Sequence, residues 1–136
     1  SMEQELAFLT SYIAFQQQRL TARLHVHTDI EKDWTGVRIY PLLFQPLIEN
    51  AFKYVRGAYE IAICLKREGT KIYFSISNSL SGAAADASAI PRTERTESGA
   101  GLSNLKKRLA LRYPNRHTLQ TRADGTCFLA ELIIDL

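Results

Sequence analysis

The sequence is poor in the residues that mark several specialised classes of protein. It has only 7 glycines, 4 prolines and 2 cysteines among 136 residues, which excludes a collagen-like repeat, wholesale disorder and a disulfide scaffold. No apolar run approaches the roughly 20 residues that a membrane-spanning helix needs, and no signal peptide is evident. A net charge of +3 without a concentrated basic stripe gives no reason to expect a nucleic-acid partner.

The remaining composition is that of an ordinary globular domain, with 46% hydrophobic and 23% charged residues. Cys64 and Cys127 lie in alternating apolar segments, and we expect buried free thiols in a reducing cytoplasm. Ser1 and Met2 resemble the scar of an expression tag. The sequence is therefore compatible with a piece of a longer protein.

Hydrophobic periodicity predicts an α/β (α+β) fold. Helical spacing favours helices over residues 3–20, 41–55 and 99–113. Period-two alternation favours strands over residues 23–30, 59–66, 71–78, 117–122 and 126–135. Because hairpin turns join most strands, we expect a two-layer sandwich with a mixed, mostly antiparallel sheet and the helices on one face.

Details of this pattern carry further expectations. Pro41 is expected to open the central helix, and Pro46 to distort its second turn. His25 and His27 fall on the polar side of the first strand and are better explained as solvated residues than as metal ligands. Residues 79–98 are small, polar and without periodicity, which is typical of a functional loop such as a lid.

Polar side chains occupy one flank of the predicted central helix. At about 100° per residue, Glu49, Lys53 and Asn50 lie roughly 40°, 80° and 140° from Gln45, and apolar side chains fill the opposite arc. One interpretation is an ordinary solvated face. The other is a site for a hydrated metal ion carrying a phosphate, because carboxylate and amide oxygens suit a hard cation and Lys suits the anion.

A glycine-containing segment, GAGLSN, follows the predicted lid. Gly99 and Gly101 precede an expected helix start, with Asn104 just beyond them. Glycines allow close approach of an anion, and the free N–H groups of a helix start favour phosphate. A simple loop hinge explains the same glycines equally well.

These motifs together resemble a known family. LLFQPLIENAFKY, followed by GAGLSNLKKRLALRYP, is similar to the ATP-binding domain of LytS/YehU-type sensor histidine kinases, and the N-terminal ELAFLTSYIAFQQQRL is similar to their linker helix. The resemblance implies the Bergerat ATPase fold. It assigns residues 1–20 to the linker helix and residues 21–136 to the ATP-binding catalytic domain.

The resemblance also implies roles for individual residues, with ATP and Mg²⁺ as cofactors. Asn50 would coordinate Mg²⁺, Glu49 would position water or polarise the metal shell, and Lys53 would contact phosphate. The lid-end residues Gly99, Gly101, Leu102 and Asn104 would lie near the nucleotide. Thr126 would help to hold adenine, although an ordinary strand role fits it as well.

Three positions depart from the family pattern. The family's Asp-x-Gly-x-Gly box, whose Asp accepts a hydrogen bond from the adenine amino group, here has Asn78 in place of Asp, Leu80 in place of the first Gly, and Gly82 as the glycine that remains. A neutral acceptor is weaker than a charged one. Tyr54 replaces a His that follows the conserved Lys.

The function implied is transfer of the ATP γ-phosphoryl group to a His on a dimerisation domain, since the family's P-H-F-L-F-N segment does not occur in these residues. A response regulator would receive the phosphoryl group, and the full-length protein would be a homodimer with this domain on the cytoplasmic side of an inner or plasma membrane. Two alternatives stay open: a degenerate domain that acts in dimerisation or docking, and an ATPase in which Glu49 activates water.

Overall fold

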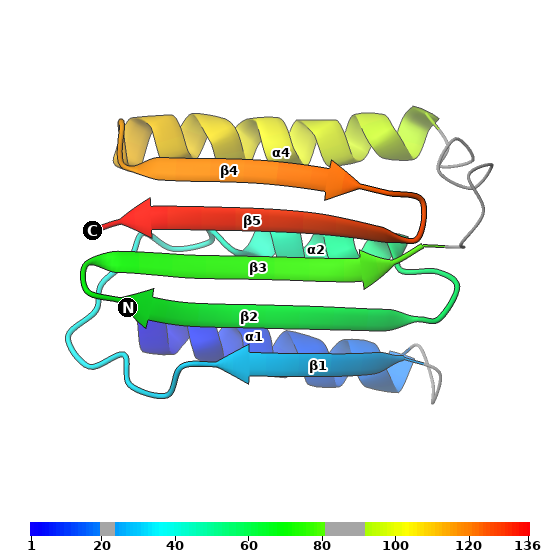
Figure 1. The fold of residues 1–136 in the computed structure, drawn as a ribbon, viewed down its shortest axis with the longest axis horizontal. Coiled ribbons are helices and arrows are strands. Elements are labelled where there is room, and N and C mark those ends of the chain that lie inside the picture. The colour runs from blue at the N-terminus through cyan, green and yellow to red at the C-terminus, as the bar shows by residue number, and fades with distance from the viewer. Residues whose placement is uncertain (20–23, 81–91) are drawn as a thin grey trace.

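The computed structural model describes residues 1–19, 24–80 and 92–136, and for residues 19 and 92–100 it describes the backbone alone. Within these residues, three helices and five strands follow one another (Figure 1). In order they are α1 (Met2–Arg19), β1 (His25–Ile30), α2 (Gln45–Tyr54), β2 (Glu60–Glu68), β3 (Lys71–Ser79), α4 (Arg92–Arg112), β4 (His117–Ala123) and β5 (Cys127–Asp135).

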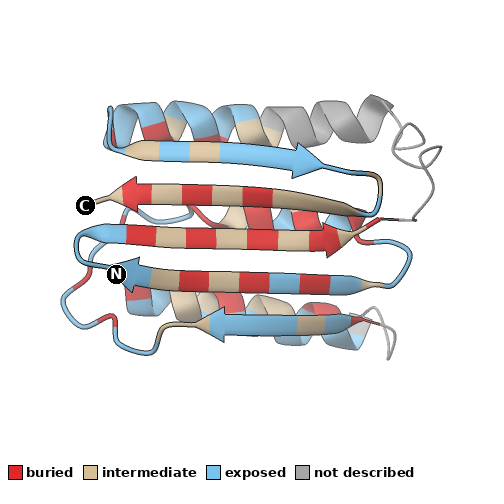
Figure 2. Ribbon diagram, in the orientation of Figure 1, coloured by how far each residue is buried: buried red, intermediate tan, exposed pale blue. Residues whose placement is uncertain are grey.

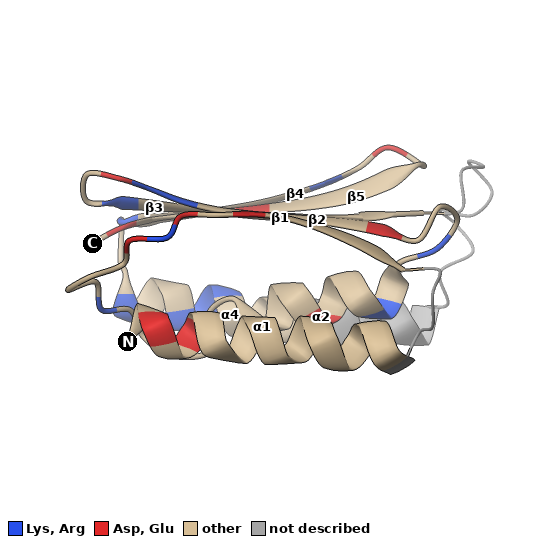
Figure 3. Cartoon of the chain, turned by 90° about the horizontal axis from the view of Figure 1, so that it is seen from below, with Lys and Arg blue, Asp and Glu red and all other residues tan. Residues whose placement is uncertain are grey.

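The five strands form a single mixed sheet in the order β1-β2-β3-β5-β4. The edge strand β1 runs parallel to β2, and the other neighbouring pairs are antiparallel. All three helices lie against one face of the sheet (Figure 3), and α2 lies between α1 and α4 (Figure 1). The predicted two-layer α/β sandwich is confirmed.

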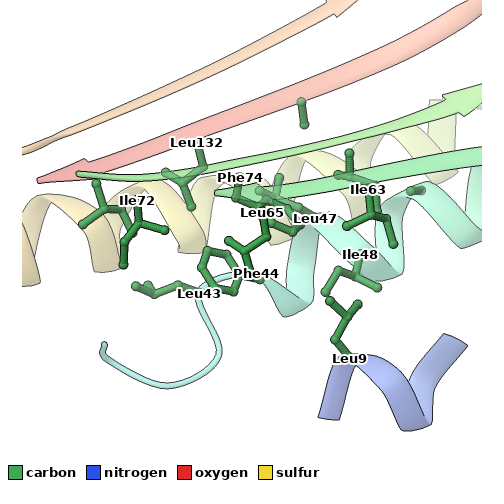
Figure 4. Close-up of a cluster of buried hydrophobic side chains, with 14 of the residues drawn as sticks. Leu9, Leu43, Phe44, Leu47, Ile48, Ile63, Leu65, Ile72, Phe74 and Leu132 are labelled. Carbon is green, nitrogen blue, oxygen red and sulfur yellow. The ribbon is translucent and has the colours of Figure 1, made fainter. Parts of the chain in front are cut away.

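The core lies between the sheet and the helices. Alternate residues of the central strands are buried, as the banding in Figure 2 shows, whereas their neighbours on the other face are half-buried or exposed. Phe44, just before α2, stacks on Phe74 of β3 with ring centroids 4.6 Å apart, near the middle of the cluster in Figure 4. Leu105, Leu109 and Tyr113 contribute the buried stripe of α4 that its apolar spacing predicts.

Helix α1 packs in the same core as the rest of the chain. Met2 and Leu9 are almost fully buried, and Leu9 lies near Ile48 of α2 (Figure 4). Phe15, by contrast, is 60% exposed. Within the described part of the chain, no helix is both long and apolar enough to cross a membrane. The assignment of residues 1–20 to a linker helix stays a prediction.

The start of α2 differs from the prediction. The helix begins at Gln45 and not at Pro41, because Leu42 has φ of +64°, a left-handed conformation that a right-handed helix excludes. Long-range hydrogen bonds hold Leu42 there: its N–H donates to Glu5 Oε1 at 3.2 Å, and its carbonyl accepts from Arg108 Nη1 at 2.8 Å. Pro46 therefore lies in the first turn, where it causes no distortion.

The start of α4 also differs. The helix begins at Arg92, so residues 92–98 of the predicted lid are helical and Ser79 belongs to β3. Residues 81–91, including Gly82, lie outside the described residues. Gly99 and Gly101 are consequently inside the helix and not at its start. The free N–H groups of the helix start, which were expected to bind phosphate next to these glycines, lie instead near Arg92.

The two cysteines are free, as predicted, but they are only half-buried. Both alternate with inward-facing residues and so lie on the sheet face opposite the helices, which explains the difference from the expected burial. Burial still raises the pKa of both the Cys64 and the Cys127 thiol. His25 and His27 are exposed on β1, in agreement with the solvated interpretation.

Candidate functional site

Helix α2 is two-sided, as its sequence predicts. Leu47, Ile48, Ala51 and Phe52 are buried, whereas Glu49 and Lys53 are exposed and Gln45 and Asn50 are half-buried. Gln45 Nε2 donates a hydrogen bond to Glu49 Oε1 at 2.7 Å. The polar face therefore contains the hydrogen-bonded pair of Gln45 and Glu49, which faces solvent, and the Asn50 amide at its margin.

The two flanks of α2 meet different helices. Phe52 makes an edge-on contact with Tyr12 of α1 at 5.4 Å between ring centroids, and Ile48 lies near Leu9 of α1. At about 100° per residue, Asn50 points roughly 160° away from both Phe52 and Ile48. Asn50 is therefore on the flank directed toward α4, on the other side of α2 (Figure 1).

Glu49 and Lys53 help to line a cavity between α1 and α2, whose lining does not include Asn50. The spacing of the sequence predicted a single polar site containing all three residues. In the fold the carboxylate of Glu49 is directed toward α1 and solvent, about 100° around the helix from Asn50, which is the separation that the sequence predicts. The roles of Glu49, Asn50 and Lys53 at a metal-phosphate site stay predictions.

Asn78 is the clearest anomaly near the Asn50 flank. It occupies an inward-facing position at the end of β3, following Ile72, Phe74 and Ile76, and is only 1% exposed. Its Nδ2 donates weakly to the Ser79 carbonyl at 3.4 Å, but its Oδ1 has no hydrogen-bond partner in the described part of the chain. An unsatisfied buried acceptor of this kind costs about 1–3 kcal/mol.

Hydrogen bonds of Ser79 join the end of β3 to the end of α2. Its hydroxyl donates to the Arg56 carbonyl at 2.7 Å and accepts from the Glu60 N–H at 2.9 Å, and its carbonyl accepts from the Arg56 N–H at 2.9 Å. This junction fixes α2 relative to Asn78. Sequence reasoning missed Ser79, since a Ser at a strand end is not by itself a signal.

Thr126 lies at the same end of the sheet as Asn78. Its carbonyl accepts from the Leu80 N–H at 2.8 Å, directly beyond the pairing of Asn78 with Phe128. Its hydroxyl is exposed and donates to Asp124 Oδ1 at 2.9 Å within the β4–β5 turn. Thr126 is thus held near the site by its backbone, and its hydroxyl oxygen still offers a lone pair.

The residues predicted from the glycine segment lie on α4, the helix that faces the Asn50 flank. Leu102 is half-buried and packs on the core, and Asn104 is exposed. A methyl group placed on Gly101 would meet no atom within 4 Å. No contact with the described residues therefore requires a glycine at this position.

The described residues do not form a metal site from acidic, His and Cys side chains alone. They contain no group of three His, Cys, Asp or Glu side chains able to hold a metal ion. Mg²⁺ is commonly bound by one or two protein oxygens together with phosphates and water, an arrangement for which Asn50 is sufficient. The free acceptor of Asn78 suits the amino group of a nucleobase.

Comparisons with known proteins find that the chain is similar to sensor histidine kinases. It is 30% identical to the sensor protein LytS of Staphylococcus saprophyticus over 132 residues, which is 91% of this chain and 22% of that protein. It is 25% identical to the sensor histidine kinase/phosphatase LytS of Staphylococcus aureus over an alignment of 139 positions, covering 94% of this chain and 24% of that protein. No family model matches the sequence.

Solved structures agree with these relatives. The catalytic domain of histidine kinase ThkA has a TM-score of 0.62 and 17% identity, covering 91% of this chain and 86% of that one. Full-length ShkA in complex with AMPPNP has a TM-score of 0.64 and 13% identity, covering 98% of this chain and 30% of that one. The chain thus has the fold of histidine kinase catalytic domains and is related to LytS along almost its whole length, as the sequence motifs predicted.

We predict that Asn78→Leu makes the empty domain more stable. Leu keeps the branching at Cγ, although it is bulkier, and it removes the unsatisfied acceptor, so the free energy of unfolding in urea should rise by about 1–2 kcal/mol. Asn78→Asp is the matched control and should lower it, because it buries a carboxylate. A Leu variant less stable than the parent would mean that Asn78 has a partner within the protein.

We also predict that the β4–β5 turn depends on pH. The pKa of Asp124 is held below its ordinary value, first by the Thr126 N–H and then by the Thr126 hydroxyl and the Cys127 N–H. Its stabilising contribution is therefore full above the unfolded pKa of about 3.9 and is lost as the pH falls through the folded pKa. Urea unfolding should show the parent and Asp124→Ala converging in stability below about pH 4; a constant difference at all pH values would contradict this.

Proposed function

We propose that this chain is the ATP-binding catalytic domain of a LytS-type sensor histidine kinase. It would donate the ATP γ-phosphoryl group to a His on a dimerisation domain outside this chain. The observation that carries the proposal is the buried, unpartnered Oδ1 of Asn78 at the end of β3. It lies where the family resemblance expects an acceptor for adenine, next to the helix that carries Asn50.

Different residues would contact different parts of the nucleotide. Asn78 would accept from the adenine amino group, with Thr126 beside it at the edge of the sheet. Asn50, on the flank of α2 that faces α4, would supply an amide oxygen to Mg²⁺, and Lys53 would reach the phosphates. Mg²⁺, when bound, neutralises charge on the phosphate oxygens during transfer. Gly99, Gly101, Leu102 and Asn104 would form the α4 side of the site.

This chain would supply positioning and charge, and the phosphate acceptor would come from elsewhere. Phosphoryl transfer needs mainly alignment and electrostatic stabilisation, so a domain that holds the nucleotide can act on a His brought to it. We further propose a response regulator as the final acceptor, a homodimeric full-length protein and a cytoplasmic position for this domain. The LytS relatives, of which the chain spans 22–24%, support this assignment.

A degenerate docking module is the second candidate. Two observations favour it: Asn78 provides a neutral acceptor where the family has a carboxylate, and Phe15 on α1 is 60% exposed. A water-activating role for Glu49 has less support, because its side chain lines the cavity against α1 and pairs with Gln45.

Titration of the chain with AMPPNP, with and without Mg²⁺, tests the proposal. We expect Mg²⁺-dependent binding that Asn50→Ala weakens by about tenfold or more, equivalent to about 1.4 kcal/mol or more, through loss of the metal ligand. In EDTA the two proteins should bind almost equally. Gln45→Ala, on the same helix, is the control and should change little.

The outcome against the proposal is equally distinct. A folded parent protein that binds no AMPPNP and gains no thermal stability from it would favour the docking module. Nucleotide binding that is unaffected by Asn50→Ala would remove the metal role of this residue.

Gly101→Ala should have opposite effects on the stability of the domain and on its affinity for AMPPNP. Alanine meets no atom within 4 Å and is the better helix former, so we expect a gain of about 0.5–1 kcal/mol in unfolding free energy. If the nucleotide approaches α4 closely, AMPPNP affinity should fall at the same time. Ala110→Gly, at an exposed α4 position, is the reverse control and should lower stability without affecting binding. Unchanged affinity in Gly101→Ala would place the nucleotide away from this turn.

A further inference from the structure

A cavity lies on the flank of α2 that faces α1. The cavity has a volume of about 340 Å³. Its walls come from both helices and the turn that follows α2: Tyr12, Gln16, Glu49, Phe52, Lys53, Val55, Arg56 and Tyr59. Its lining contains Lys53, which is proposed to reach the phosphates, but neither Asn50 nor Asn78, so the cavity borders the proposed nucleotide site without including its metal and adenine contacts.

Three aromatic side chains give the cavity flat apolar walls. Phe52 is almost fully buried and meets the Tyr12 ring edge-on at 5.4 Å. Tyr59 has φ of +53°, which is uncommon for a residue other than glycine. Two backbone hydrogen bonds hold it there, from the His25 N–H to its carbonyl at 2.9 Å and from its N–H to the Arg56 carbonyl at 3.3 Å. Such a held conformation is typical of residues that position a side chain for binding.

Two polar groups in the lining have no protein partner. Gln16 is only 8% exposed, yet its amide makes no side-chain hydrogen bond with any described residue. Tyr59 is half-buried, and no hydrogen bond of its hydroxyl is found within the same part of the chain. Neither side chain contributes a fully buried atom without a partner, so both polar groups can reach solvent in the empty cavity and are available to whatever fills it.

Arg56 gives the cavity a fixed positive group. Its Nη1 donates to the carbonyls of Lys53 at 3.2 Å and Val55 at 2.7 Å, which anchors the guanidinium at the C-terminal end of α2. Its other nitrogen atoms donate to no residue of the described chain. The nearby carboxylate of Glu49 is already paired with Gln45. A guanidinium with free N–H groups can bind a carboxylate in a planar, bidentate arrangement.

We propose that this cavity binds a small planar aromatic molecule that carries a carboxylate. The ring would lie among Tyr12, Phe52 and Tyr59, the carboxylate would accept from Arg56, and the Gln16 amide would provide a further hydrogen bond. The volume is within the range of ligand sites of small molecules, which are mostly apolar with a few placed polar groups. A bound molecule would contact α1 and α2 at once.

Titration of the ¹⁵N-labelled chain with 2-naphthoate, in the absence of nucleotide, tests this site. We expect saturable amide shifts centred on residues 12–16, 52–56 and 59. The uncharged 2-naphthamide should bind at least about fivefold more weakly, because it lacks the charge-assisted bond. Arg56→Gln should weaken naphthoate by a similar factor without changing naphthamide, whereas Gln16→Leu should weaken both. Arg67→Gln, an exposed Arg on β2, is the matched control.

Three results would overturn the proposal. They are the absence of saturable shifts around the cavity, equal affinity for the acid and the amide, and displacement of naphthoate by Mg²⁺-AMPPNP, which would make the cavity part of the nucleotide site. Since the titration contains no nucleotide, its failure leaves the proposed ATP-binding function unaffected, and loss of AMPPNP binding leaves this site unaffected.

Discussion

The hydroxyl of Ser79 is the contact on which the arrangement of the candidate site depends. It joins the Arg56 carbonyl at the end of α2 to the Glu60 N–H at the start of β2, and so fixes the helix against the strand that carries Asn78. The Arg56 N–H bond to the Ser79 carbonyl and the stacking of Phe44 on Phe74 reinforce this junction between α2 and β3. Side chains far apart in sequence become one site because their backbones share these hydrogen bonds.

A second constraint follows from the one-sided packing of the helices. Because α2 buries one stripe on the sheet and has a helix on each side (Figure 1), its polar residues are divided between two flanks. Asn50 is directed toward α4, and Glu49 and Lys53 line the cavity next to α1. One amphipathic helix thus lines a cavity on one flank and carries Asn50 on the other. The sequence alone suggested a single site.

The elements of the fold were predictable because their periodicity reflects burial on one face. The alternating strands and the Leu102, Leu105 and Leu109 stripe needed no tertiary information. The start of α2 was not predictable, since the left-handed conformation of Leu42 is held by partners 37 and 66 residues away. The sequence also could not show that Glu49 lies toward α1 and Asn50 toward α4, because helical angles alone do not say which helix packs on which side of α2. The roles of the individual site residues stay predictions.

The replacement of the family's Asp by Asn78 can be understood from the burial of this position. A carboxylate at 1% exposure would lose nearly all of its hydration whenever the site is empty, and such burial is far more costly for a charge than for an amide. The amide therefore lowers the cost of the empty state and, at the same time, offers adenine a weaker acceptor. Both effects reduce the difference in free energy between the empty and occupied domain. Under the proposed function, such a domain should release its nucleotide readily and depend more strongly on the Mg²⁺–phosphate contacts proposed for Asn50.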